Sequence, residues 1–134
     1  MDYQLTIVRT PTYLHATGTG DHTADNVRRF LADAHRAAVA SNCDAMLLEM
    51  RFSGPSLALG SIYSIVAEAS RDGSWFKRIA YVDANPTHSP DRAEFAEVAA
   101  NKLGVNMRLF RSVTEAESWF LGAAAVASAG GSAG

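Results

Sequence analysis

The residues whose side chains could do chemistry follow the predicted strands of this chain, at the points where the strands end. In open α/β sheets, ligands bind beyond the carboxyl ends of the strands, where several loops meet. Seven polar residues fall at such positions and form the candidate rim of an interaction or ligand site: Asp21, His22, Ser53, Ser56, Asp83, His88 and Arg111. The alternative is that they only cap helices and form turns, which are common roles for these residue types.

No complete catalytic or metal-binding pattern accompanies this rim. Asp21, His22 and Ser56 are the residue types of a hydrolase triad, but no predicted strand leads into a Gly-x-Ser-x-Gly turn. The four histidines lack the spacing of metal ligands, and Cys43 is the only cysteine. We therefore expect no catalytic residues, no metal, no cofactor and no enzymatic activity.

Two other segments have alternative interpretations. Trp75 and Phe76 follow a Gly-Ser pair in a predicted loop, so they lie either in an interface with a partner or in the core. The segment Gly18-Thr-Gly20 lacks the third glycine and the Lys-Ser/Thr pair of a phosphate-binding loop. We expect it instead to end a strand and turn into a helix.

Stretches rich in β-branched and aromatic residues predict five strands, at residues 3–9, 12–17, 45–50, 77–82 and 105–110. Thr10-Pro11 predicts a tight turn between the first two, which makes an antiparallel hairpin. Helix start signals follow at Thr23, Ser56, Ser89-Pro90 and Ser112, and Gly104 predicts the end of the third helix.

Apolar residues at helical spacing predict the buried side of each helix. The first helix has Val27, Phe30, Leu31, Ala34 and Ala38, and the second has Leu59, Ile62, Tyr63 and Val66. The third has Phe95, Val98, Ala99 and Leu103, and the last has Ala116, Trp119 and Phe120.

The element order is β-β-α-β-α-β-α-β-α, which predicts a single α/β domain with a mixed, mostly parallel five-stranded sheet and about four helices. We assign this domain to residues 1–121. Residues 122–134 are a low-complexity tail of alanine, glycine, serine and one valine, with almost no side-chain area to bury.

Composition excludes several classes of protein. Of the 134 residues, 48% are apolar and 19% charged, which suits a packed core. The net charge of −2 comes without a cluster of basic residues, so we expect no nucleic-acid partner. No stretch approaches the roughly 18 apolar residues of a membrane span. A single cysteine and the lack of a signal peptide favour a cytoplasmic location.

Several segments together carry a resemblance to a known family: Met46–Met50 with the Gly54 loop, Tyr63, Lys77–Asp83, Phe95, Asn101–Phe110, and Glu115-Ala116 with Trp119. In their order and spacing, over about residues 3–121, the chain resembles the SpoIIAA-like family of the STAS superfamily, also described as STAS/Sec14-like. The resemblance implies a βα fold and a non-enzymatic role.

The resemblance implies two kinds of function. Anti-sigma-factor antagonists of this superfamily bind a protein kinase and are switched by phosphorylation of a serine in an Asp-Ser-Ser-Gly-like turn. Here Ser56 is nearest to that serine, but the Asp-Ser pair is absent. The Sec14-like branch implies an apolar or lipid-like ligand.

We therefore expect a non-catalytic protein-interaction or regulatory module, with a carrier or sensor of a small apolar ligand as the alternative. The expected partner is another protein or, as a homodimer, a second copy of the chain. A cavity of several hundred Å³ would favour the carrier. A packed interior with an exposed apolar helix face would favour the module.

Overall fold

The computed structural model describes residues 3–71, 78–86, 88 and 90–122. Five strands form one sheet in the order β1-β2-β3-β4-β5. They are β1 (Gln4–Arg9), β2 (Leu14–Asp21), β3 (Ala45–Ser53), β4 (Arg78–Asp83) and β5 (Met107–Phe110). The predicted α/β class is confirmed. Strand β1 pairs antiparallel with β2, and each later neighbour is parallel.

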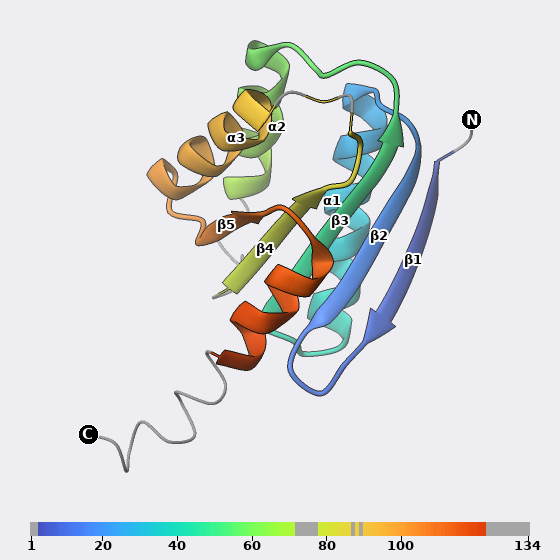
Figure 1. The fold of residues 1–134 in the computed structure, drawn as a ribbon, viewed down its shortest axis with the longest axis vertical. Helices are drawn as coiled ribbons and strands as arrows, with labels where there is room; N and C mark the ends of the chain where they lie inside the picture. Colours follow the sequence, from blue (N-terminus) through green and yellow to red (C-terminus); the bar gives the residue numbers. More distant parts are fainter. Residues whose placement is uncertain (1–2, 72–77, 87, 89, 123–134) are drawn as a thin grey trace.

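Helices cover the two faces of the sheet unequally (Figure 1). Helices α1 (Ala24–Ala40), α2 (Leu59–Ser70) and α3 (Pro90–Lys102) each connect two parallel strands. They share one apolar core with the sheet, which includes Phe30, Ile65 and Ala100. A final helix over residues 113–122 packs on the opposite face through Ala116 and Phe120. Among the described residues, this short helix is the one helix that covers the second face.

The first and last helices start at the predicted signals, where side-chain oxygens accept hydrogen bonds from backbone N–H groups. Thr23 caps α1, and its hydroxyl accepts a hydrogen bond from the N–H of Asn26 at 3.1 Å. Ser112 accepts from the N–H of Glu115 at 3.2 Å, and the Glu115 carboxylate accepts from the N–H of Arg111 at 3.1 Å. These contacts confirm the first and last helix starts. Ser89 lies outside the described residues.

The second strand is longer than expected, because Gly18 and Gly20 continue β2 rather than end it. Gly18 lies against the rings of Phe30 and Phe52, and a Cβ atom there would come within 2.7 Å of one Phe30 carbon. The two fully buried rings also contact each other edge to face, with centroids 5.9 Å apart. Glycine is therefore required by close packing within a strand, and the prediction of a strand break was wrong.

The buried stripe of α1 is confirmed at Val27, Phe30, Ala34 and Ala38, whereas Leu31 is half-buried. The stripe of α2 was predicted wrongly. Ile65 is its buried residue, Ile62 and Val66 are half-buried, and Leu59 and Tyr63 are exposed. Helix α2 begins at Leu59, after the predicted start at Ser56, and a different side of the helix therefore faces the core.

Of the predicted stripe of α3, Ala99 is confirmed as buried and Phe95 is half-buried, but the buried side chains of this helix are all small. Its buried residues are Ala93, Ala96, Ala99 and Ala100. Val98 is 51% exposed and Leu103 38%. Alanines allow α3 to lie close to α2 and the sheet, and close packing offsets the smaller apolar area of each side chain.

The final helix is anchored by aromatic rings. Tyr13 stacks on Phe120, with ring centroids 4.7 Å apart, and its hydroxyl donates to Glu117 at 2.9 Å. Burial and this hydrogen bond raise the pKa of Tyr13 to about 12. Of the predicted anchors, Ala116 and Phe120 are fully buried, and Trp119 is partly buried against Phe110.

Glu49 is a buried carboxylate in the middle of β3, only 4% exposed, on the face that the final helix covers in part. It pairs with Arg51, and its Oε1 atom lies 2.7 Å from Nε2 of His15. Burial alone would raise the pKa of Glu49, but hydrogen bonds and charge from Arg51 and His15 outweigh it, so the pKa lies below its ordinary value.

This direction predicts how stability depends on pH. A carboxyl whose folded pKa is lowered stabilises the fold above its unfolded pKa, here about 4.5, and loses that contribution as the pH falls through the folded value. Glu49→Gln should therefore cost about 1–3 kcal/mol at neutral pH and clearly less in acid. Urea melts of both proteins at about pH 7 and about pH 4 measure this difference. The prediction would be contradicted if the difference in unfolding free energy between wild type and Glu49→Gln were the same at both pH values.

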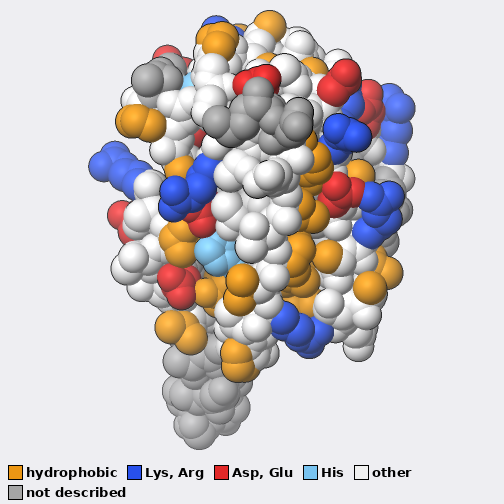
Figure 2. All heavy atoms as spheres, turned by 90° about the vertical axis from the view of Figure 1, so that its right-hand side faces the viewer, with side chains coloured by type: hydrophobic (Ala, Val, Ile, Leu, Met, Phe, Trp, Pro, Cys, Tyr) orange, Lys and Arg blue, Asp and Glu red, His pale blue; other side chains and the backbone are white. Residues whose placement is uncertain are grey.

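The surface on the β1 side carries charges of both signs around a vertical band of hydrophobic side chains (Figure 2). Partly buried residues of this side, including Leu5 and Ile7, pack against the core under α1. No described helix combines the length and apolar character that a membrane crossing requires.

The candidate interface aromatics Trp75 and Phe76 lie outside the described residues, as does the tail from residue 123.

Candidate functional site at the strand ends

The carboxyl ends of β2, β3 and β4 meet at one edge of the sheet. Asp21 ends β2 opposite Ser53 at the end of β3, and the N–H of His22 donates to the Ser53 carbonyl at 2.7 Å. Asp83 ends β4 beside Met50 of β3. The structure therefore brings the loops of the predicted rim together, as parallel strand ends require.

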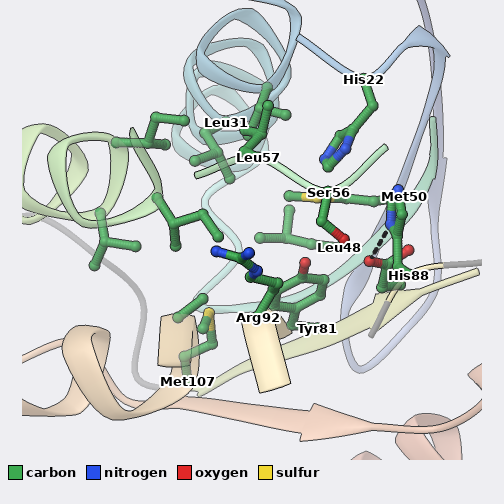
Figure 3. Close-up of a pocket in the computed structure, with 16 residues that line it drawn as sticks. His22, Leu31, Leu48, Met50, Ser56, Leu57, Tyr81, His88, Arg92 and Met107 are labelled. Atoms are coloured by element: carbon green, nitrogen blue, oxygen red, sulfur yellow. Dashed lines mark hydrogen bonds and ion pairs between the residues drawn. The ribbon is translucent and has the colours of Figure 1, made fainter. Parts of the chain in front are cut away.

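A cavity of about 70 Å³ opens at this edge, between the sheet and helices α1, α2 and α3 (Figure 3). Most of its wall is apolar and includes Leu31, Leu48, Ile62, Val66 and Met107. Four of the seven rim residues line it: His22, Ser56, Asp83 and His88.

The other three rim residues do not line this cavity. Asp21 and Ser53 are exposed strand ends. Arg111, after β5, is exposed and borders a separate surface hollow that Asp83 and His88 line from the other side.

His88 joins the loops that follow β3 and β4. Its side chain is 4% exposed, and its Nδ1 atom lies 2.7 Å from Oδ2 of Asp83. Its Nε2 atom lies 2.7 Å from the carbonyl oxygen of Gly54, a residue with a positive φ of 113°. Asn85 donates from its side chain to the carbonyl of Phe52 at 3.0 Å. These contacts hold both loops in one arrangement.

His22 lies beside His88, with ring centroids 4.4 Å apart. Its Nδ1 atom lies 2.8 Å from the carbonyl oxygen of Pro55, so the ring faces the backbone of the loop before α2. A hydrolase triad of Asp21, His22 and Ser56 would need this nitrogen against the carboxylate of Asp21. The observed geometry is that of a histidine that positions a loop.

Ser56 was expected to cap α2, and this interpretation was wrong. The N-cap residue is Ala58, which offers no side-chain hydrogen bond, and the helix begins at Leu59. Ser56 lies in the loop three residues before Leu59, and its hydroxyl points into the cavity (Figure 3). Its position is therefore explained by the cavity rather than by the helix.

Two residues of the cavity mouth were missed in the sequence. Arg92 reaches the cavity from the first turn of α3, four residues before the buried Ala96, and this helical spacing was the available signal. Tyr81 reaches it from β4. Burial, reinforced by the charge of Asp83, raises the pKa of Tyr81 above its ordinary value, so its phenol remains a hydrogen-bond donor.

Within the part of the chain that the structure describes, no three His, Cys, Asp or Glu residues are arranged to hold a metal ion. The chemical content of the site is thus an apolar hollow with histidines, hydroxyl groups, one carboxylate and one guanidinium at its mouth. Such a site can bind a small molecule through apolar contacts and hydrogen bonds.

Comparison with known proteins concerns the fold. No protein-family model matches the chain, and no curated protein matches it. A solved structure with a similar fold is that of an uncharacterized protein of the DUF3478 family from Shewanella loihica PV-4, described as having a SpoIIAA-like fold. The two are 18% identical, with a TM-score of 0.52, over 88% of this chain and 93% of that one. The chain therefore has a SpoIIAA-like fold, as the resemblance of its sequence led us to expect.

Proposed function

We propose that this protein is a non-catalytic interaction module that binds a protein partner through the outward face of α2. The observation that carries the proposal is an apolar pair on that face. Leu59 is 45% exposed and Tyr63 49%, and they lie one helical turn apart. Tyrosine is enriched at interfaces, because its ring contributes much contact area for little conformational entropy, and Leu59 adds apolar area beside it.

The surroundings of this pair support a binding surface. Helix α3 packs against α2. The loop that leads into α2 is held by His22 and His88 through the carbonyls of Pro55 and Gly54. A surface held in one arrangement before binding loses less conformational entropy when a partner docks. The rim thus supports the surface by positioning its loop.

The size of the cavity favours the module over the carrier of a lipid-like ligand. Pockets for drug-sized ligands occupy about 300–1,000 Å³. The cavity at the strand ends measures about 70 Å³, far too little for a lipid chain. A non-catalytic role is supported by the contacts of the two rim histidines, because Nδ1 of His22 and both ring nitrogens of His88 lie against backbone carbonyls or Asp83.

The proposal predicts that polar substitution on α2 removes binding without unfolding the protein. The double variant Leu59→Ser, Tyr63→Ser should lose a partner that wild type retains from a lysate of its native host. Val39→Ser is the control, because Val39 is 58% exposed and belongs to the last turn of α1, not to the face of α2 that carries Leu59 and Tyr63. Circular dichroism should show the same helix content in all three proteins.

The partner is then purified and titrated against each protein. Binding to the double variant should be at least about tenfold weaker, as expected when an interface residue of this kind is truncated. Native mass spectrometry of the protein alone shows whether the partner is a second copy of the chain. Equal binding of the purified partner by wild type and the double variant would refute the role of this face.

A further inference from the structure

We propose that the cavity at the strand ends binds a short aliphatic carboxylate, with its apolar body between the helices and the sheet and its carboxylate held by Arg92, Ser56 and Tyr81. This site is separate from the outward face of α2, so the inference does not depend on the proposed partner. It rests on the chemistry of the cavity mouth and on the size of the space behind it.

The first observation is an unpaired cation at the mouth of an apolar cavity. Arg92 is half-buried, and its guanidinium forms no hydrogen bond or ion pair with any described residue. A partly desolvated guanidinium without an acceptor is unfavourable, and its planar pair of N–H groups matches a carboxylate. By contrast, Arg28 pairs with Glu68 and Arg36 with Asp33 on the outer surface.

The second observation is a pair of hydroxyl groups beside this cation. Ser56 and Tyr81 reach the cavity from the loop before α2 and from β4, and Figure 3 shows their oxygens and Arg92 directed toward the same space. Neither hydroxyl has a hydrogen-bond partner among the described residues. Three donors from three separate elements therefore line the same cavity, and a carboxylate bound there would accept hydrogen bonds from them.

The charges around the mouth favour a monoanion. Among the described residues that line the cavity, Asp83 is the one that is acidic, and both of its oxygens are engaged. Oδ2 faces His88 at 2.7 Å, and Oδ1 accepts from the N–H of Asn85 at 3.0 Å. The single guanidinium of Arg92 balances one negative charge, whereas the second charge of a phosphate dianion would meet the Asp83 carboxylate.

The volume behind the donors sets the size of the apolar body. A cavity of about 150 Å³ lined by apolar side chains holds benzene. This cavity, at about 70 Å³, has room for a shorter group, and its wall includes Leu48, Ile62 and Met107. A branched group of three or four carbons attached to a carboxylate, as in isovalerate, fits both the space and the donors. A ligand of so few atoms is expected to bind in the millimolar range.

Isothermal titration calorimetry with sodium isovalerate tests this site. Wild type should bind isovalerate, and Arg92→Gln should bind it at least about tenfold more weakly, because one charged hydrogen-bonding partner is lost. Arg71→Gln is the matched control, since it removes the same charge from an exposed residue after α2 that does not line the cavity. It should bind as wild type does.

Two further ligands separate charge from shape. Isovaleramide keeps the shape without the negative charge, and isobutyl phosphate carries a larger, more highly charged head; both should bind more weakly than isovalerate. Ala96→Leu, which places a larger side chain in the cavity wall, should abolish binding while leaving Arg92 in place.

The idea is overturned if wild type does not bind isovalerate, or if Arg92→Gln binds it as well as Arg71→Gln does. It is also overturned if the amide or the phosphate binds more tightly than the carboxylate. Amide chemical shifts in nitrogen-15 NMR spectra should move at residues that line the cavity, which places the ligand independently of any variant. Shifts confined to another surface would refute the location.

Discussion

Replacing Phe30 with alanine is expected to destabilise the fold by about 3–5 kcal/mol. The ring is fully buried in the core between α1 and the sheet, and it packs edge to face against Phe52. Truncation removes this apolar contact and leaves a hollow that the surrounding strands and helices cannot fill completely, because the protein interior is close-packed. Chemical denaturation of wild type and variant measures the loss.

Val39→Ala is the control for Phe30→Ala. Val39 belongs to the same helix but is 58% exposed, so its truncation should change stability by less than about 0.5 kcal/mol. Within α2, Ile65→Ala should cost more than Ile62→Ala, because Ile65 is buried and Ile62 is half-buried beside the cavity. A loss below about 1 kcal/mol for Phe30→Ala would show that this core position has been misjudged.

Gly18→Val is expected to prevent normal packing of the same core. Even a single Cβ atom at this position would lie 2.7 Å from one carbon of Phe30 and 2.9 Å from one carbon of Phe52. Both rings are fully enclosed, so they cannot move aside cheaply. Overpacking of this kind costs about 1–3 kcal/mol of stability. Valine adds two further methyl groups, so Gly18→Val should cost about 3 kcal/mol or more.

Gly60→Ala is the matched control, because a Cβ atom at Gly60 of α2 meets nothing within 4 Å. Alanine there should leave stability unchanged or raise it by up to about 1 kcal/mol through helix propensity. Adding Phe52→Leu to Gly18→Ala should recover part of the stability that Gly18→Ala loses, because one of the two clashing rings is removed. Without any such coupling between the two substitutions, the assigned clash would be incorrect.

The sequence was most informative where local interactions decide the structure. Thr23 and Ser112 predicted helix starts because their hydroxyls bond N–H groups only three residues away. Gly104, with a φ of 89°, predicted a helix end because that backbone conformation favours glycine. The alternation of strands and helices predicted the mostly parallel sheet, since parallel neighbours need a crossover between them.

The sequence was less informative where contacts between elements far apart in the chain decide which residues are buried. The buried side of α2 depends on the residue at which the helix starts and on the side chains of α3 that pack against it. Neither of these is a local property of the α2 sequence. Alanines made α3 a close neighbour, while Leu59 and Tyr63 were left at the surface. Glu49 was visible as a charged residue in an apolar strand, but its partners His15 and Arg51 depend on strand pairing and on which face stays partly uncovered.

By itself, the sequence determined the element order, several helix ends and the edge of the sheet at which the polar loops meet, because hydrogen bonds over a few residues and the handedness of βαβ crossovers set these features. The tertiary structure alone decided that β2 continues through Gly18, that His88 joins two loops, and that Ser56, Tyr81 and Arg92 face one cavity. The physical reason is that each of these contacts joins residues from separate elements, and the relative placement of those elements follows from packing of the whole core.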